Sequence, residues 1–326
     1  MSRGRLDGVL DFAIVPGYSR LGYRLRGLRW EDAVAGDLRT ALVTGGTSGI
    51  GEAICEGLVQ AGASVHVLGR DERRVDEAIR RIASRVPDAP GELVPEVCDV
   101  SSVSDVHRFA EQFDELHPDL DVLVHNAGLL AQRRELTDDG VELTFATNVL
   151  GPFLLTSLLL PALSSGGPGR VITVASGGMY TSRLRADDVQ LEDEPFDGPA
   201  VYAHTKRIQV VLNELWAERE PTREIAFSAM HPGWVDTPGL RASLPRFARM
   251  TRPLLRSARE GADTAVWLAT ARSPEPASGG FWHDRAPRTT HRGPWTRESD
   301  DERERLWSAC EALIRTLPDA PTARPE

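Results

Sequence analysis

From residue 40 onward, short apolar runs alternate with longer segments in which apolar residues recur at helical spacing. The short runs are typical of buried strands, and the longer segments have the periodicity of helices. This alternation predicts one doubly wound α/β domain, a parallel sheet with helices on both faces. The predicted strands are 40–44, 64–68, 93–97, 121–125, 171–175, 225–229 and 280–283, and the predicted helices lie near 50–61, 72–85, 102–116, 140–163, 200–219 and 258–270.

The pattern divides the chain into an extension at 1–38, a single domain at 39–286 and a tail at 287–326 with one helix near 301–316. The extension is rich in arginine and aromatic residues, whereas the rest of the chain is acidic. We expect the extension to pack on its own domain. Peripheral contact with an anionic membrane surface, or with a partner, is the alternative, because basic and aromatic residues favour both.

Composition narrows the class of protein. The 326 residues are 41% hydrophobic, enough for a sizeable core, and the net charge of −10 disfavours nucleic acid as a partner. Three cysteines without CxxC spacing, and no visible zinc-binding set, indicate reduced thiols in a cytoplasmic protein with no bound metal. No secretory signal precedes the domain. The apolar run at 149–163 is shorter than the roughly 20 residues of a bilayer span and contains two prolines, so it predicts a core or interface helix.

A glycine-rich turn follows the first predicted strand and opens the first helix of the domain. Glycines let the backbone turn tightly and approach a phosphate group, and the helix N-terminus supplies free N–H groups and a positive dipole end. An ordinary tight turn between a strand and a helix is the alternative. The order of strand, turn and helix favours a dinucleotide pyrophosphate site, formed by Thr44, Gly45, Thr47, Ser48, Gly49, Ile50 and Gly51.

The end of the second strand bears on which dinucleotide binds. An acidic residue there bonds the ribose 2′-hydroxyl of NAD, whereas a nearby arginine accommodates the 2′-phosphate of NADP. The acidic position falls on Gly69, Arg70 follows directly, and Asp71 is expected to point away. We therefore expect NADP(H) as the preferred cofactor, with NAD(H) as the alternative.

Two further strand ends are expected to face the same ligand, because ligands bind beyond the carboxyl ends of the strands in this architecture. Asp99 and Val100 follow the third strand, and the Asp99 carboxylate is placed to accept from the adenine amino group. Small residues after the fourth strand, Asn126, Ala127 and Gly128, let the backbone lie against the cofactor.

A tyrosine and a lysine four residues apart open the helix near 200–219 and share one of its faces. Lys206 is the only lysine of the chain, which otherwise uses arginine for every cation. A free phenol has a pKa of about 10, and a nearby ammonium together with a cationic nicotinamide lowers it towards the working range of a general acid–base. Ser176 follows the fifth strand and can donate to a substrate oxygen. A surface Tyr202–Lys206 pair and an ordinary turn serine are the alternative interpretations.

Together, the glycine-rich turn, Asn126–Gly128, Ser176 and the Tyr202–Lys206 pair resemble the short-chain dehydrogenase/reductase family over roughly residues 40–286. Residues 134–140 and 151–156 are similar to its retinol-dehydrogenase-like branch. The resemblance implies a Rossmann-type fold and an oxidoreductase that acts on alcohols or carbonyls. It also implies that Asn148 holds a water in a proton relay with the lysine, that Lys206 bonds the nicotinamide ribose, and that Pro232 and Gly233 lie beside the nicotinamide.

The segment 234–256, expected to cover the substrate, mixes apolar residues with arginines and favours a hydrophobic carbonyl or alcohol as substrate. Packing of these apolar residues on the core is the alternative. A catalytically silent NADP(H)-binding regulatory or scaffold protein is the main rival function, but it gives no reason to keep Ser176, Tyr202, Lys206 and Asn148 together. A nucleotide-sugar epimerase fits the glycine spacing less well. Association into a homo-oligomer is left open.

Overall fold

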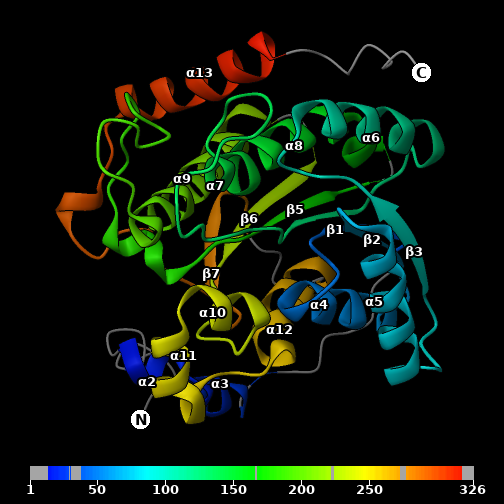
Figure 1. Cartoon of the computed structure of the whole chain (residues 1–326). Helices are drawn as coiled ribbons and strands as arrows, with labels where there is room; N and C mark the ends of the chain where they lie inside the picture. Colours follow the sequence, from blue (N-terminus) through cyan, green and yellow to red (C-terminus); the bar gives the residue numbers. More distant parts are fainter. Residues whose placement is uncertain are drawn as a thin grey trace.

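The computed structural model describes residues 14–28, 30, 38–165, 167–221, 224–271 and 277–317. They contain one eight-stranded sheet in the order β3-β2-β1-β4-β5-β6-β7-β8, parallel throughout except where β8 pairs antiparallel with β7 (Figure 1). The predicted doubly wound fold is therefore confirmed. The strands are β1 (Thr40–Thr44), β2 (Ser64–Gly69), β3 (Glu92–Val97), β4 (Val122–His125), β5 (Gly169–Val174), β6 (Ile225–Met230), β7 (Gly280–His283) and β8 (Ala286–Pro287).

Helices cover both faces of the sheet, as Figure 1 shows. One layer holds α6 (Val103–Leu116), α8 (Gly151–Ser165) and α9 (Gly198–Arg219), and the other holds α4 (Gly49–Gln60), α5 (Glu72–Arg85) and α12 (Ala258–Thr270). Alternate residues of β1 serve the two cores: Leu42 packs with the first layer, and Ala41 and Val43 pack with the second. Strands buried on both faces explain why the sequence shows unbroken apolar runs rather than alternation.

Helix α8 is the carboxyl part of a longer helical run that begins with α7 (Leu143–Phe145) and passes through a π-helical turn, η1 (Ala146–Leu150). The sequence predicted one regular helix here. Pro152 supplies the reason for the difference, because proline lacks the N–H that the carbonyl of residue 148 would use and its ring clashes with that carbonyl. The run is apolar and long enough to cross a membrane, but 78% of its most apolar window is buried inside the domain, as expected for a core helix.

The described part of the extension packs on the domain. It forms α2 (Ile14–Tyr18) and α3 (Arg20–Gly27), neither of which the sequence predicted. The Tyr18 ring is buried edge-on against His231 and His283, at centroid distances of 4.5 and 5.2 Å. Arg26 Nη1 donates to the carboxylate of Asp284 at 2.7 Å. Contact of the extension with a membrane stays a hypothesis, and residues 1–13 and 31–37 lie outside the described residues.

The tail also belongs to the domain. Helix α13 (Asp300–Thr316) places Trp307 against Trp216 of α9 and Phe153 of α8, with ring centroids 4.7 and 5.0 Å away. Upstream of α13, the Glu298 carboxylate accepts from the guanidinium of Arg207 at 2.6 Å, and both side chains are buried. The last helix was predicted from its periodicity, whereas its anchoring to α9 was not.

Candidate active site

The glycine-rich turn between β1 and α4 has the backbone that the sequence predicted. Gly45 and Gly49 adopt φ of +64° and +58°, a left-handed conformation that glycine tolerates best. At Gly51 a side chain would place its Cβ 2.2 Å from the Gly45 carbonyl oxygen, so no larger residue fits. The turn therefore keeps its backbone open to a ligand from the side of the helix N-terminus.

The N-terminus of α4 suits an anion. Ser48 is the N-cap residue but makes no side-chain capping bond, so the first N–H groups of this 12-residue helix are not satisfied by its side chain. Thr237 lies above the turn, with its Cγ2 3.3 Å from where a Cβ on Gly49 would stand. The residues present fit a pyrophosphate held between the helix end and the segment after β6, and the sequence analysis did not single out Thr237.

Asn126 holds the turn in place. Its Nδ2 donates to the carbonyls of Thr44 and Gly45 at 3.1 and 3.0 Å, and the backbone N–H groups of Asn126 and Ala127 both donate to the Thr44 hydroxyl at 3.1 Å. The sequence analysis assigned Asn126 to the cofactor directly. The structure gives its side chain an indirect role, because the amide is committed to the loop that would receive the phosphates.

At the end of β2, Arg70 is exposed, and Asp71 caps α5 by accepting from the backbone N–H of Arg74 at 2.9 Å. The Asp71 carboxylate is thus engaged with its own helix. A Cβ on Gly69 would lie 2.5 Å from Thr47 Cγ2, so an acidic side chain has no room at this strand end. These positions are compatible with a 2′-phosphate near Arg70, but they do not decide between the two cofactors.

The end of β3 differs in detail from the prediction. Asp99 Oδ1 accepts from the backbone N–H and hydroxyl of Ser101 at 3.0 and 2.7 Å, so this oxygen is used by the local turn. The Val100 side chain is buried in the core beside α6 and α8. A contact of Val100 with the adenosine could therefore come only from its backbone, and the predicted roles of both residues stay predictions.

Ser176, Tyr202 and Lys206 come together where β5 ends and α9 begins. The Ser176 side chain lies close enough to the Tyr202 hydroxyl to lower the pKa of the phenol. The Lys206 Nζ lies 5.4 Å from the centre of the Tyr202 ring and donates to the Val174 carbonyl at 3.0 Å. Asp197 caps α9 by accepting from the Ala200 N–H, which fixes where the helix begins and hence which face carries the pair. The three side chains therefore lie in one group, and their catalytic roles stay predictions.

Burial is the largest influence on the pKa values of Tyr202 and Lys206. Burial raises the pKa of Tyr202, and the hydrogen bond with Ser176 offsets part of that rise. Burial also lowers the pKa of Lys206 to about 7. The expected lowering of the tyrosine pKa is therefore not produced by the groups of the chain alone, because a desolvated ammonium is itself easily lost.

Asn148 lies in the π turn and connects three elements. Its Oδ1 accepts from the Leu129 N–H at 2.9 Å, and its Nδ2 donates to the Leu129 carbonyl and to the Thr205 hydroxyl at 3.1 and 2.9 Å. The main-chain carbonyl of Asn148 accepts from Gln209 Nε2 at 2.6 Å. The Gln209 side chain also accepts from Lys206 Nζ, so it bridges Asn148 and the lysine, which the resemblance expected a water to connect. The sequence analysis did not single out Gln209.

Beside Ser176, the walls of the site come from distant parts of the chain. The Gly177 N–H donates to Nδ1 of His231 at 3.0 Å, and a Cβ on Gly177 would lie 3.2 Å from the Tyr18 ring. Gly233 has φ of +80° and packs against the buried Arg256, and its predicted place beside the nicotinamide, with Pro232, stays a prediction. Tyr18 was not predicted here, since nothing local in the sequence links it to residues after β5 and β6.

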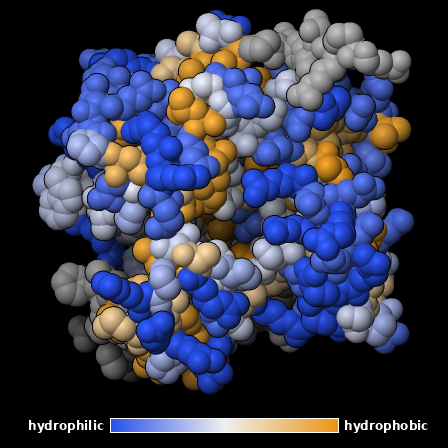
Figure 2. Space-filling model, in the orientation of Figure 1, coloured by the Kyte–Doolittle hydropathy of each residue, from blue (hydrophilic) through white to orange (hydrophobic). Residues whose placement is uncertain are grey.

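Two short helices follow β6, α10 (Pro238–Ser243) and α11 (Pro245–Thr251), where the sequence placed a covering segment. Gln132 Nε2 donates to the Ser243 carbonyl at 3.2 Å, so this lid reaches the loop after β4. Phe247 packs edge-on against Trp234, with ring centroids 5.3 Å apart. This contact is what the alternative interpretation expects, namely apolar residues that pack on the protein. In Figure 2 the surface is hollowed in the region where Figure 1 places α10 opposite α9, with hydrophobic residues inside the hollow.

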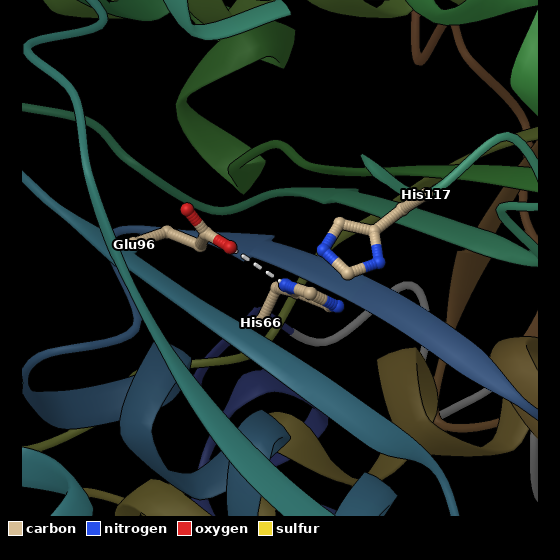
Figure 3. A group of neighbouring side chains, drawn as sticks. All are labelled: His66, Glu96 and His117. Atoms are coloured by element: carbon tan, nitrogen blue, oxygen red, sulfur yellow. Dashed lines mark hydrogen bonds and ion pairs between the residues drawn. The ribbon is translucent and has the colours of Figure 1, made fainter. Parts of the chain in front are cut away.

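A second cluster of polar side chains lies on β2 and β3, beneath the end of α6 (Figure 3). His66 Nδ1 and Glu96 Oε1 are 2.8 Å apart, and the His66 ring lies edge-on against His117 at 4.3 Å. The ligand atoms of the three residues lie within 4.8 Å of one another, although the Glu96 oxygen is already paired with His66. No metal was predicted, and three separate elements supply the group, so no local motif could have revealed it.

Residues 39–246 match the model of a family described as short chain dehydrogenase, and the chain belongs to the short-chain dehydrogenase/reductase family of alcohol and carbonyl oxidoreductases. It is 43% identical over 307 residues to dehydrogenase/reductase SDR family member 12 of Bos taurus, over 91% of this chain and 94% of that one. Retinol dehydrogenase 12 of Homo sapiens is 32% identical over 278 residues, 84% of this chain and 86% of the relative. The Pseudomonas aeruginosa RhlG/NADP active-site complex superposes with a TM-score of 0.62 at 25% identity, covering 77% of this chain and 96% of RhlG.

Proposed function

We propose that the protein is an NADP(H)-dependent oxidoreductase that moves a hydride between the nicotinamide and a hydrophobic carbonyl or alcohol. The observation that carries the proposal is the meeting of Tyr202, Ser176 and Lys206 at the carboxyl end of β5, next to an uncapped helix N-terminus suited to a pyrophosphate. The catalytically silent alternative leaves this assembly unexplained.

Ser176, Tyr202 and Lys206 have separate roles in the proposed reaction. When bound, the nicotinamide supplies or takes the hydride. Ser176 donates a hydrogen bond to the substrate oxygen and so holds it next to the Tyr202 hydroxyl. Tyr202 gives its phenolic proton to that oxygen in reduction and takes it back in oxidation. The Lys206 ammonium stabilises the phenolate left behind.

Tyr202→Phe tests the role of the phenol. Turnover should fall by at least about a hundredfold, while binding of NADPH, followed by quenching of tryptophan fluorescence, stays close to wild type. Tyr180→Phe is a matched control, because it removes a phenol that donates to the Thr289 carbonyl at 2.6 Å outside the catalytic group. Equal turnover of Tyr202→Phe and Tyr180→Phe would refute the assignment.

The preference for NADP(H) is supported by Arg70, exposed at the end of β2 where Gly69 leaves no acidic side chain. A charge-assisted hydrogen bond contributes about 1.5–3 kcal/mol, so Arg70→Ala should lower kcat/KM for NADPH about ten- to a hundredfold and leave NADH use nearly unchanged. Arg73→Ala is the control, since Arg73 is an exposed cation on the next helix, paired with Glu77. An equal loss with both cofactors would remove the preference.

The proposal of a hydrophobic substrate is supported by the apolar residues of the lid and by the retinol dehydrogenase among the relatives, named for an apolar alcohol. Burial of one methylene group contributes about 0.8 kcal/mol. Across a series of linear aldehydes, kcat/KM should therefore rise about three- to fourfold per added carbon until the hollow is filled. A flat series would show that the lid packs only on the protein.

A further inference from the structure

Gln209 lies three residues beyond Lys206 on α9, a spacing that brings two side chains to the same face of a helix. Its carboxamide is buried between the lysine and the helix that carries Asn148. Oε1 of Gln209 accepts from Lys206 Nζ at 3.0 Å, and Nε2 donates to the main-chain carbonyl of Asn148 at 2.6 Å. One neutral side chain therefore bridges the catalytic cation and the neighbouring backbone.

Pro152 explains why that carbonyl is available. In an α-helix the carbonyl of Asn148 would accept from the N–H of residue 152. Proline has no N–H to offer, and the chain adopts a π turn over Ala146–Leu150 instead. A buried carbonyl without a partner is unfavourable, and the Gln209 amide satisfies it.

The surroundings of the lysine are neutral. Its two acceptors are the Val174 carbonyl of β5 and the Gln209 carboxamide of α9, and burial is the sole cause that lowers the pKa of Lys206 to about 7. In the part of the chain that the structure describes, the titratable groups facing this region are Tyr202 on α9 and His125 on β4. Burial lowers the pKa of His125 to about 3, so its ring is neutral at physiological pH. The charge of the lysine therefore depends on the few dipoles that touch it.

We propose that Gln209 is a positioning residue, whose carboxamide holds the Lys206 ammonium in place and keeps water from reaching it from the interior of the domain. A carboxamide accepts and donates hydrogen bonds but does not titrate in the working range of enzymes. It stabilises the charge without carrying the proton away, so protons reach Tyr202 from the side of cofactor and substrate. The inference rests on the proposed function, since Lys206 belongs to the same catalytic group.

A small cavity beside Gln209 is the place from which water would reach the ammonium if the carboxamide were absent. It has a volume of about 30 Å³ and is also lined by His125, Asn148 and Asn213. A volume of this size accommodates a water molecule when polar partners are present. Nδ1 of His125 is buried without a hydrogen-bond partner among the described residues and can provide one. Shortening Gln209 would join this cavity to the ammonium and admit water.

The single lysine of the chain allows a direct test. Protein labelled with ¹³C at lysine Cε, and carrying no lysine in its tag, gives one lysine signal, whose pH titration reports the pKa of Lys206 in the intact protein. Gln209→Leu fills the same space without an acceptor and should lower that pKa by about one to two units, the equivalent of a lost hydrogen bond to a charged group. Gln209→Ala should lower it less, because water replaces the amide. Gln209→Glu should raise it.

Catalysis should follow the lysine. In Gln209→Leu, kcat should fall about two- to tenfold near pH 6, where the wild-type amine is charged and the variant's is largely neutral; the deficit should grow to about ten- to a hundredfold above pH 8 and close below about pH 4, where both amines are charged. The free energy of unfolding should fall more in Gln209→Ala than in Gln209→Leu, since the alanine variant has a cavity and the leucine variant does not. This order is the reverse of the order expected for the lysine pKa. Asn213→Leu is the matched control: it lies one turn further along α9, lines the same cavity, and should leave the lysine titration unchanged.

An unchanged lysine pKa in Gln209→Leu, or a larger drop in Gln209→Ala than in Gln209→Leu, would overturn the proposal and leave Gln209 as a space-filling residue. The lysine titration does not depend on turnover. If the wild-type protein reduced no substrate, the proposed function would fail, while the order of the three variants would still decide the role of Gln209.

Discussion

Lys206 and Arg207 are consecutive on α9 and both are buried, yet their surroundings differ. Among the described residues, the Lys206 ammonium donates to two neutral acceptors, the Val174 carbonyl and the Gln209 carboxamide. The Arg207 guanidinium donates to the Glu298 carboxylate at 2.6 Å and so ties the tail to the domain. One helix thus presents a cation without a carboxylate partner to the catalytic site and a carboxylate-paired cation to the tail.

The difference separates chemistry from stability. A buried cation without a carboxylate is unfavourable, but its charge responds to nearby groups, which a proton-transfer site requires. A buried ion pair holds its charge, and removal of one partner leaves the other unpaired and strongly destabilises the fold. The chain uses lysine where the charge must respond, and arginine, which stays charged, where it must anchor.

Replacing each of the two cations by the other type should give the largest differences in turnover and stability. Lys206→Arg should lower kcat by about a hundredfold or more, because the planar guanidinium cannot take the position of a compact ammonium and does not titrate in the same range. Arg207→Lys should keep most of the turnover and lose stability, since one ammonium cannot replace the bonds that Arg207 donates to Glu298 and to the carbonyls of Thr290 and Thr296. Steady-state kinetics and urea unfolding of both variants make the comparison. Comparable turnover in Lys206→Arg and Arg207→Lys would contradict the assignment of Lys206 to catalysis and of Arg207 to stability.

Removal of the anchor should give the next largest effect. Glu298→Gln leaves the Arg207 charge buried and unpaired, and breaking a buried pair costs about 3–5 kcal/mol in the free energy of unfolding. Glu304→Gln is the control, because the Arg219–Glu304 pair also has a separation of 2.6 Å but Glu304 is 66% exposed. An exposed pair contributes about 0–1 kcal/mol. The contrast between two pairs of equal length isolates burial as the cause, and equal losses would argue against it.

Lys206→Met should change the free energy of unfolding by less than Glu298→Gln does, and it should raise that free energy rather than lower it. Burial lowers the pKa of Lys206 to about 7 in the folded protein, against about 10.4 when unfolded. Between these values the unfolded chain binds a proton that the folded chain has released, so wild-type stability rises with pH across this window. The penalty is complete below about pH 7 and disappears above about pH 10.

The inactive methionine variant should therefore be more stable than wild type near pH 7, by about 2–4 kcal/mol, and the gain should vanish towards pH 10. Urea unfolding at several pH values measures it. A gain that does not change with pH would mean that methionine simply packs better, and a loss would mean that the ammonium is stabilised in the fold.

Local sequence patterns were sufficient where a feature is contained in one short segment. The tight turn at Gly45 and Gly49 follows from the glycines themselves. Tyr202 and Lys206 could be paired because helical spacing places both on one face. Strands β1 to β7 were predicted to within two residues at their ends from their apolar runs, whereas the two-residue strand β8 was not predicted.

Features assembled from distant segments could not be read from these patterns. The bridge from Gln209 to Asn148 spans 61 residues, and the approach of Tyr18 to Gly177 depends on the docking of the extension. Glutamine at position 209 looks like any polar residue of an amphipathic helix. Only Pro152 offered a local signal, since a proline four residues after Asn148 must leave that carbonyl without its helical partner.

The contact of Arg26 with Asp284 joins residues 258 positions apart. During synthesis the first of these leaves the ribosome long before the second, so the extension must wait for almost the whole chain before it finds its place. Contacts of such separation form slowly, and early segments left without their partners are prone to aggregate. Tyr18 beside Gly177 is thus expected to be among the last parts of the catalytic pocket to settle, and a chain released early would carry its nucleotide turn but lack this wall.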